Sequence, residues 1–122
     1  MPARAADLAE IDTFCDALWL EDGLAKATLD SYRSDLGRLA LWLADNAGEP
    51  LLDLRETALT AFIAHLSRQT RASSQARYLS TLRRFYRWQL ARGRIVADPT
   101  LKLANPTRPS RLPKVMSEKQ VD

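Results

Sequence analysis

The spacing of its apolar residues constrains this chain more than any other feature of the sequence. From Ser73 to Leu90, apolar side chains recur at steps of three and four residues: Ala76, Leu79, Leu82, Tyr86 and Leu90. This period matches the turn of an α-helix, so it predicts one long helix with a single buried face. Ser73 and Ser74 are expected to cap its start, because their hydroxyls can accept hydrogen bonds from free backbone N–H groups.

The same spacing predicts three earlier helices. The first is expected from Asp7, as N-cap, to Glu21, and the second from Ala27 or Thr28 to about Asn46. The third is expected from Glu56 to Gln69. Their buried stripes are Ile11, Phe14, Cys15 and Leu18, then Leu29, Tyr32, Leu36, Leu39 and Leu43, then Leu59, Phe62, Ile63 and Leu66. Runs that alternate between apolar and polar residues are missing, so the sequence predicts an all-α four-helix bundle.

The segment after the fourth helix is expected to return to this bundle. Gly93 would end the helix, and Ile95, Val96 and Leu101 would fold back on the core. At Asp98-Pro99 the composition changes. Pro99, Pro106, Pro109 and Pro113 follow with Arg108, Arg111 and Lys114 between them, which is typical of an extended, basic, proline-rich linker. Ser117 and Gln120 then resemble the capped start of another helix. The expected organisation is a domain over residues 1–104, a linker over 105–116 and the start of a truncated second domain over 117–122.

Charge is distributed unevenly along the chain. Residues 1–56 contain five basic and twelve acidic side chains, whereas residues 57–122 contain thirteen basic and three acidic ones. Such an asymmetry favours a polyanionic partner for the second half.

The predicted fourth helix carries a second face suited to such a partner. Ser73, Arg77, Ser80, Arg84 and Arg87 share this face, and between Arg71 and Ala97 there are seven arginines and no acid. An unpaired stripe of this kind is a candidate for DNA contact, while the alternative is a solvated basic face. The predicted second helix begins with Lys26, Thr28 and Ser31, which suit phosphate or base contacts but also serve as ordinary capping residues.

Several other classes of site find no support in the sequence. One cysteine excludes an internal disulfide, and one cysteine with one histidine cannot form a metal site. Cys15 falls in an apolar stripe and is expected to be a core residue, while His65 is expected to be structural or exposed. No membrane-length apolar run, signal pattern or cofactor-binding motif is present, so we expect a cytoplasmic protein without a cofactor or small-molecule substrate.

Three stretches resemble the tyrosine recombinases of the phage-integrase family. The first contains Asp16-Ala17-Leu18-Trp19-Leu20-Glu21, Leu24, Thr28-Leu29, Tyr32-Arg33 and Asp35-Leu36. The second contains Ala72-Ser73-Ser74, Ala76-Arg77, Leu79-Ser80 and Arg83. The third contains Asp98-Pro99, Arg111-Leu112-Pro113-Lys114, Ser117-Glu118 and Val121. Their order and spacing are similar to Xer-type recombinases, and the run Asp16–Glu21 favours the XerD type over the XerC type or an integrase relative.

The resemblance implies a core-binding, SAM-like domain that forms one jaw of a clamp around duplex DNA. In this family the second and fourth helices cross the DNA, and a basic linker follows the backbone to the catalytic domain. Thr28, Ser31, Ser73 and Arg77 match contact positions on the helices, and Arg111 and Lys114 match the linker. With the basic face, the candidate DNA-contact residues are Lys26, Thr28, Ser31, Arg71, Ser73, Ser74, Arg77, Ser80, Arg84, Arg87, Arg111 and Lys114.

One residue departs from the pattern of a phosphate-binding helix start. Asp30 lies between Thr28 and Ser31, and a carboxylate there repels phosphates. It is expected to point away, to pair with a basic neighbour, or to accept a hydrogen bond from a cytosine amino group. Arg77 or Lys26 could read a guanine in the major groove.

The resemblance also carries expectations about activity and partners. The family's catalytic residues belong to the second domain, so this chain is expected not to be an enzyme by itself, although the intact protein would be a site-specific tyrosine recombinase. The XerD type implies chromosome dimer resolution with a XerC-like recombinase in a synaptic tetramer and a DNA-translocase regulator. The alternatives are a phage or mobile-element integrase, or a helical protein-interaction module that uses Trp19, Trp42 or Trp88.

Overall fold

The computed structural model describes residues 2–46 and 48–103, and every regular element among them is helical. The elements are α1 (Ala5–Asp22), α2 (Lys26–Asp45), the short 3-10 helix η1 (Leu51–Asp53), α3 (Glu56–Ser67) and α4 (Ala72–Ala91). The all-α prediction with four helices is therefore confirmed. The expected linker over 105–116, the expected domain start over 117–122, and Arg111 and Lys114 lie outside the described residues.

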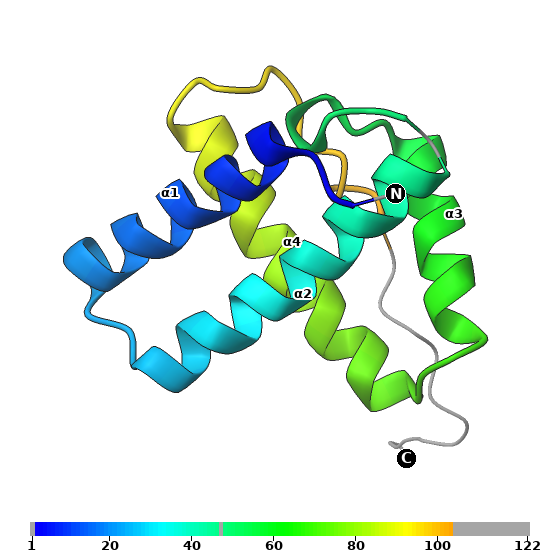
Figure 1. Cartoon of the computed structure of the whole chain (residues 1–122), viewed down its shortest axis with the longest axis horizontal. Helices are drawn as coiled ribbons and strands as arrows, with labels where there is room; N and C mark the ends of the chain where they lie inside the picture. The colour runs from blue at the N-terminus through cyan, green and yellow to red at the C-terminus, as the bar shows by residue number, and fades with distance from the viewer. Residues whose placement is uncertain (1, 47, 104–122) are drawn as a thin grey trace, which may run out of the picture.

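The four helices form two pairs that cross one another (Figure 1). A short turn at Gly23, whose φ is +64°, reverses the chain between α1 and α2. In Figure 1, α2 crosses α4 near the middle of both helices, and α3 lies on the opposite side of the bundle from α1. This crossing brings the middle of α2 against the first half of α4, which is the region that matters for the candidate site.

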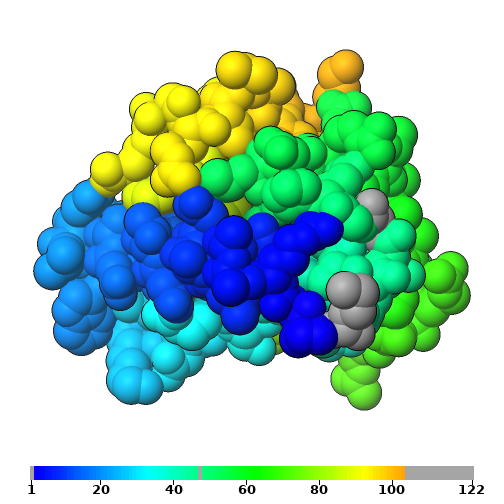
Figure 2. Space-filling view, turned by 45° about the horizontal axis from the view of Figure 1, so that its top comes forward, coloured from blue at the N-terminus to red at the C-terminus, as the bar shows by residue number. Residues whose placement is uncertain are grey.

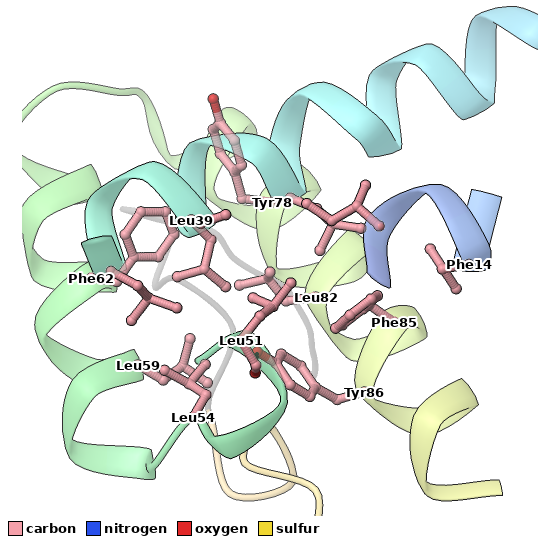
Figure 3. Close-up of a cluster of buried hydrophobic side chains, with 14 of the residues drawn as sticks. Phe14, Leu39, Leu51, Leu54, Leu59, Phe62, Tyr78, Leu82, Phe85 and Tyr86 are labelled. Atoms are coloured by element: carbon pink, nitrogen blue, oxygen red, sulfur yellow. Dashed lines mark hydrogen bonds between the residues drawn. The ribbon is translucent and has the colours of Figure 1, made fainter. Parts of the chain in front are cut away.

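A core of apolar side chains joins all four helices and η1 (Figure 3). The apolar periodicity predicted most of it, including Phe14, Leu36, Leu59 and Leu82, none of which exposes more than a trace of surface. Cys15 is buried in this core as expected, and burial raises the pKa of its thiol, which keeps the thiol protonated.

The buried face of α4 is wider than one stripe, and there the prediction was partly wrong. Leu90 is exposed, whereas Tyr78, Phe85 and Gln89 are buried beside the expected residues. A helix that packs on two sides buries a second row of residues, because α4 contacts α2 on one side and α3 on the other. The expected return of the following segment is also only partly right, since Ile95 packs on the core but Val96 is 99% exposed and Leu101 is 78% exposed.

The expected N-terminal caps are wrong for α1 and α4. Arg4 and Arg71 occupy the N-cap positions, and neither makes a side-chain capping hydrogen bond. Asp7, the expected N-cap, lies within the first turn of α1, and its buried Oδ1 accepts a hydrogen bond from the backbone N–H of Leu51 at 2.9 Å. A tertiary hydrogen bond to η1 therefore takes the carboxylate that a local cap would have used.

Tyr86 fixes η1 from the other side. Its hydroxyl is fully buried and donates a hydrogen bond to the backbone carbonyl of Leu51 at 2.7 Å. Burial, together with the charges of Asp7, Asp98 and Glu49, raises the pKa of this phenol well above its ordinary value near 10. The folded state therefore holds the neutral phenol at pH values where the unfolded chain ionises.

Tyr86→Phe should lower the free energy of unfolding at pH 7 by about 1–2 kcal/mol, because it leaves the Leu51 carbonyl without its partner. In the parent, the raised pKa stabilises the fold fully below pH 10, and this stability should decline by about 1.4 kcal/mol per pH unit as pH rises above it. Tyr86→Phe has no phenol to ionise at this position, so its unfolding free energy should not show this part of the decline above pH 10. Urea unfolding between pH 7 and 11 measures both effects, with Tyr32→Phe as the matched control at pH 7. An unchanged stability for Tyr86→Phe would contradict the role of this hydrogen bond.

Within residues 2–46 and 48–103, no helix combines the length and the apolar character needed to cross a membrane.

Candidate nucleic-acid interface

The exposed side of α4 presents its arginines and serines beside the α1–α2 turn. Ser80, Arg84 and Arg87 line one open hollow of about 620 Å³ together with Tyr32 of α2 and Asp22 of α1. Ser73 and Arg77 extend the same face toward the start of α4, because steps of four, three and four residues keep these side chains on one side of a helix. The structure thus brings the predicted stripe to one surface.

Arg77 is the most strongly held side chain of this face. Its Nη2 donates a hydrogen bond to Asp35 Oδ1 at 2.9 Å, and its guanidinium lies 4.8 Å from the centre of the Tyr78 ring. Thr81 also donates a hydrogen bond to the Asp35 carboxylate, at 3.0 Å. Arg77 is therefore fixed where α2 and α4 cross.

Arg84 is also paired, but at the surface. Its Nη2 lies 2.9 Å from Asp22 Oδ2, and its guanidinium stands 5.9 Å from the centre of the Tyr32 ring. Both charged side chains remain partly exposed, so this ion pair is screened by solvent and contributes little to stability.

The expectation of an unpaired arginine stripe is therefore wrong for two of its members. Further along, Arg92 pairs with Glu21 at 2.5 Å, and Arg94 pairs with Glu10 at 2.7 Å. Figure 2 shows why: α1 lies directly between the segment that follows α4, in yellow, and the start of α2, in cyan. The acidic first half of the chain thus neutralises part of the basic second half within the molecule.

Arg71 and Arg87 differ from the paired arginines Arg77, Arg84, Arg92 and Arg94. Both are exposed, and neither makes an ion pair with a carboxylate in the described part of the chain. Arg71 occupies the N-cap position of α4, followed by the exposed Ser73 and the half-buried Ser74. The positive end of the helix dipole lies at the same place, so this helix start suits an anion.

The start of α2 contributes a second group of candidates. Lys26 pairs with Asp30 at 2.7 Å, and both side chains are exposed. Of the three expectations for Asp30, the structure therefore shows pairing with a basic neighbour. Thr28 and Ser31 are half-buried and lie at helical steps of seven and four residues before Asp35, which places them on the face of α2 that meets α4.

Two of the three tryptophans named for the protein-interaction alternative, Trp42 and Trp88, pack on the core. Trp88 packs with Phe14 at a ring distance of 5.5 Å, and Trp42 packs with Phe62 at the same distance. His65 stacks on Phe62 and packs at a tilted angle against Trp42, so it is structural. Trp19 remains exposed. Among the described residues, no group of three His, Cys, Asp or Glu side chains is suited to a metal ion.

Sequence reasoning missed the residues that organise this surface. Asp35, which accepts a hydrogen bond from Thr81, pairs with Arg77. Asp22 and Tyr32 contact Arg84. One signal was available: Asp35 falls directly beside the apolar stripe of α2, where a charged residue is costly unless a partner meets it.

Curated relatives align with nearly the whole of this chain. Over 122 aligned residues it is 40% identical to the tyrosine recombinase XerD of Ralstonia nicotianae, covering 100% of this chain and 39% of that protein. It is 44% identical to the XerD of Xanthomonas campestris pv. campestris, covering 99% of this chain and 38% of that protein. The XerD of Pseudomonas aeruginosa is 44% identical over 92% of this chain and 38% of its own length. The chain thus spans about two fifths of the relatives it matches.

The family comparison agrees with these similarities. Residues 11–93, which run from α1 to the end of α4, match the family described as phage integrase, N-terminal SAM-like domain. That range contains the crossing of α2 and α4, the hollow beside it and the helical core. The chain belongs to the phage-integrase N-terminal SAM-like family and is similar to the N-terminal domain of XerD-type tyrosine recombinases.

Proposed function

We propose that this chain binds duplex DNA through the crossed helices α2 and α4 and forms one jaw of a recombinase clamp. The observation that carries the proposal is the shared surface of Arg77, Ser80, Arg84 and Arg87 in a chain of this family. The relatives it matches are named tyrosine recombinases, which supports DNA as the partner.

The arginines divide into two kinds of contact. Arg71 and Arg87 have no carboxylate partner in the described residues and can neutralise phosphates with release of counterions. Arg77 is held at a fixed place and is suited to read a base edge, with Ser73 small enough to let the helix approach the groove. Phosphate contacts position the domain, whereas base contacts specify its site.

The wider role follows from the relatives. We place strand cleavage by a tyrosine nucleophile in a part of the intact protein outside these 122 residues. Its XerD-like relatives favour chromosome dimer resolution in the cytoplasm with a XerC-like recombinase and a DNA-translocase regulator, over a phage or mobile-element role. A tryptophan-centred protein contact has weaker support, because Trp42 and Trp88 pack on the core.

Binding should weaken steeply with salt if phosphates supply the affinity. A duplex can be selected by the chain from a randomised pool, and its binding isotherms measured between 50 and 300 mM salt, roughly the range over which counterion release is resolved. Arg87→Ala should reduce the slope of log K against log salt by about 0.9, the value for one phosphate contact.

Arg55→Ala is the matched control for that experiment. Arg55 is an exposed arginine at the N-cap of α3, paired with Glu49 at 2.5 Å, and the start of α3 lies away from the crossing of α2 and α4 (Figure 1). This variant should keep the parent's slope. If the folded parent retains no duplex at low salt, or binds one with no salt dependence, the proposed DNA interface is wrong.

A further inference from the structure

Asp35 places a carboxylate in the protein interior, where a charge is energetically unfavourable. The residue is 1% exposed, in the middle of α2, and its carboxylate accepts hydrogen bonds from Arg77 Nη2 at 2.9 Å and Thr81 Oγ1 at 3.0 Å. A buried carboxylate is tolerated only when it is paired and hydrogen-bonded, and an apolar residue would serve packing as well or better. Its presence at the α2–α4 crossing therefore calls for a role beyond packing.

The carboxylate is one end of a chain of contacts that fixes the guanidinium of Arg77. On its other side, Arg77 lies over the Tyr78 ring at 4.8 Å. Arg38 in turn donates a hydrogen bond to the Tyr78 hydroxyl at 3.2 Å, which holds that ring in place. The Arg77 side chain nevertheless remains 53% exposed, so a fixed donor group faces solvent on the candidate DNA surface.

We propose that Asp35 is a positioning residue for sequence recognition: with Thr81, its buried carboxylate orients Arg77 so that the guanidinium meets a base edge without further ordering. The inference rests on the proposed DNA-binding function and goes beyond it, because it separates one arginine from the phosphate-binding set. A pre-ordered arginine loses less side-chain entropy on binding than a free one. Pairing with Asp35 also cancels much of its charge, so Arg77 contributes to discrimination more than to general attraction.

Side-chain NMR tests the positioning directly in the free protein. The Nε–Hε group of Arg77 should show a heteronuclear NOE close to that of the helical backbone, whereas that of Arg87 should be clearly lower. Asp35→Asn should lower the Arg77 value to that of Arg87. If Arg77 is already as mobile as Arg87 in the parent, the positioning role is wrong, whatever the DNA measurements give.

Binding measurements test the consequence, using a duplex selected by the parent from a randomised pool and a scrambled duplex of equal composition. The discrimination ratio is the dissociation constant for the scrambled duplex divided by that for the selected duplex. Asp35→Asn should lower this ratio about tenfold, within the range of one bidentate base contact. Binding to the scrambled duplex should be equal or tighter, because a negative charge is removed and Arg77 is free to meet phosphate. In an Arg77→Ala background, Asp35→Asn should change the ratio by less than about twofold, since the coupled pair is already broken.

The outcomes separate this inference from the proposed function. A folded parent that retains no DNA overturns both. A parent that selects a duplex but discriminates as well after Asp35→Asn overturns the positioning role alone, and so does an equal loss of discrimination with and without Arg77. Should Asp35→Asn fail to fold by circular dichroism, Thr81→Val replaces it, because that variant removes one hydrogen bond and keeps both charges. A loss of discrimination of about threefold is then expected, and an unchanged ratio overturns the inference.

Discussion

Phe14→Ala should lower the free energy of unfolding of this chain by about 3–5 kcal/mol, the usual cost of removing a buried phenylalanine side chain. Phe14 is completely buried, and its ring lies 5.2 Å from that of Phe85 and 5.5 Å from that of Trp88. It also stacks on Tyr32 at 6.3 Å. One side chain of α1 therefore contacts aromatic residues of both α2 and α4, and its loss leaves a cavity where three helices meet.

Urea unfolding followed by circular dichroism measures the effect. Leu20→Ala is the matched control, because Leu20 is an apolar residue of the same helix with 79% of its surface exposed. It should change the unfolding free energy by less than about 0.5 kcal/mol. Equal effects of the two substitutions would show that α1 is not anchored through Phe14.

Arg77→Ala should damage both the fold and the recognition of DNA. It leaves the buried Asp35 carboxylate without its cationic partner, and breaking a buried pair in this way costs about 3–5 kcal/mol when both partners are buried. Because Arg77 is half exposed, water can reach the vacated place, and the expected cost is about 1–3 kcal/mol. Discrimination between selected and scrambled duplexes should fall about tenfold as well.

The stability of Arg77→Ala should be compared with that of Arg87→Ala and of a double variant. Arg87→Ala removes an arginine from the same helix that has no carboxylate partner in the described residues, so it should leave stability within about 0.5 kcal/mol of the parent. The double variant Asp35→Asn/Arg77→Ala should recover part of the stability lost in Arg77→Ala, because no unpaired buried charge remains. If Arg77→Ala and Arg87→Ala are equally stable, Asp35 does not depend on Arg77.

The helices of this fold were predictable because their signal is local. The three- and four-residue steps of Leu79, Leu82 and Tyr86 record which side of α4 faces the core. The burial of Phe85 and the exposure of Leu90 were not predictable, since they depend on how α4 lies between two neighbouring helices. The expected cap of α1 failed for a similar reason: the Asp7 carboxylate bonds to η1, 44 residues away in the chain.

The candidate site was predictable as a face but not as a set of contacts. Helical spacing alone brings Ser80, Arg84 and Arg87 together. The partners of Arg77 and Arg84 come from α2 and α1, at sequence separations of 42 and 62 residues. No local pattern encodes such a meeting, so a stripe without acids on its own helix predicts unpaired arginines. The contact roles of the twelve candidate residues remain predictions, to be decided by the binding experiments above.

The acidic carboxylates of α1 have a consequence for any DNA that reaches this surface. Asp22 and Glu21 already hold Arg84 and Arg92, so a phosphate that approaches must exchange places with a carboxylate instead of meeting a free cation. Each such exchange returns less free energy than a new ion pair, and the loss is the same for every sequence. In the proposed complex, the carboxylates of α1 thus compete with the DNA phosphates for these arginines from within the same molecule. Binding to every sequence is then weaker by the same amount, while the contact of Arg77, which depends on Asp35 of α2, still distinguishes one sequence from another.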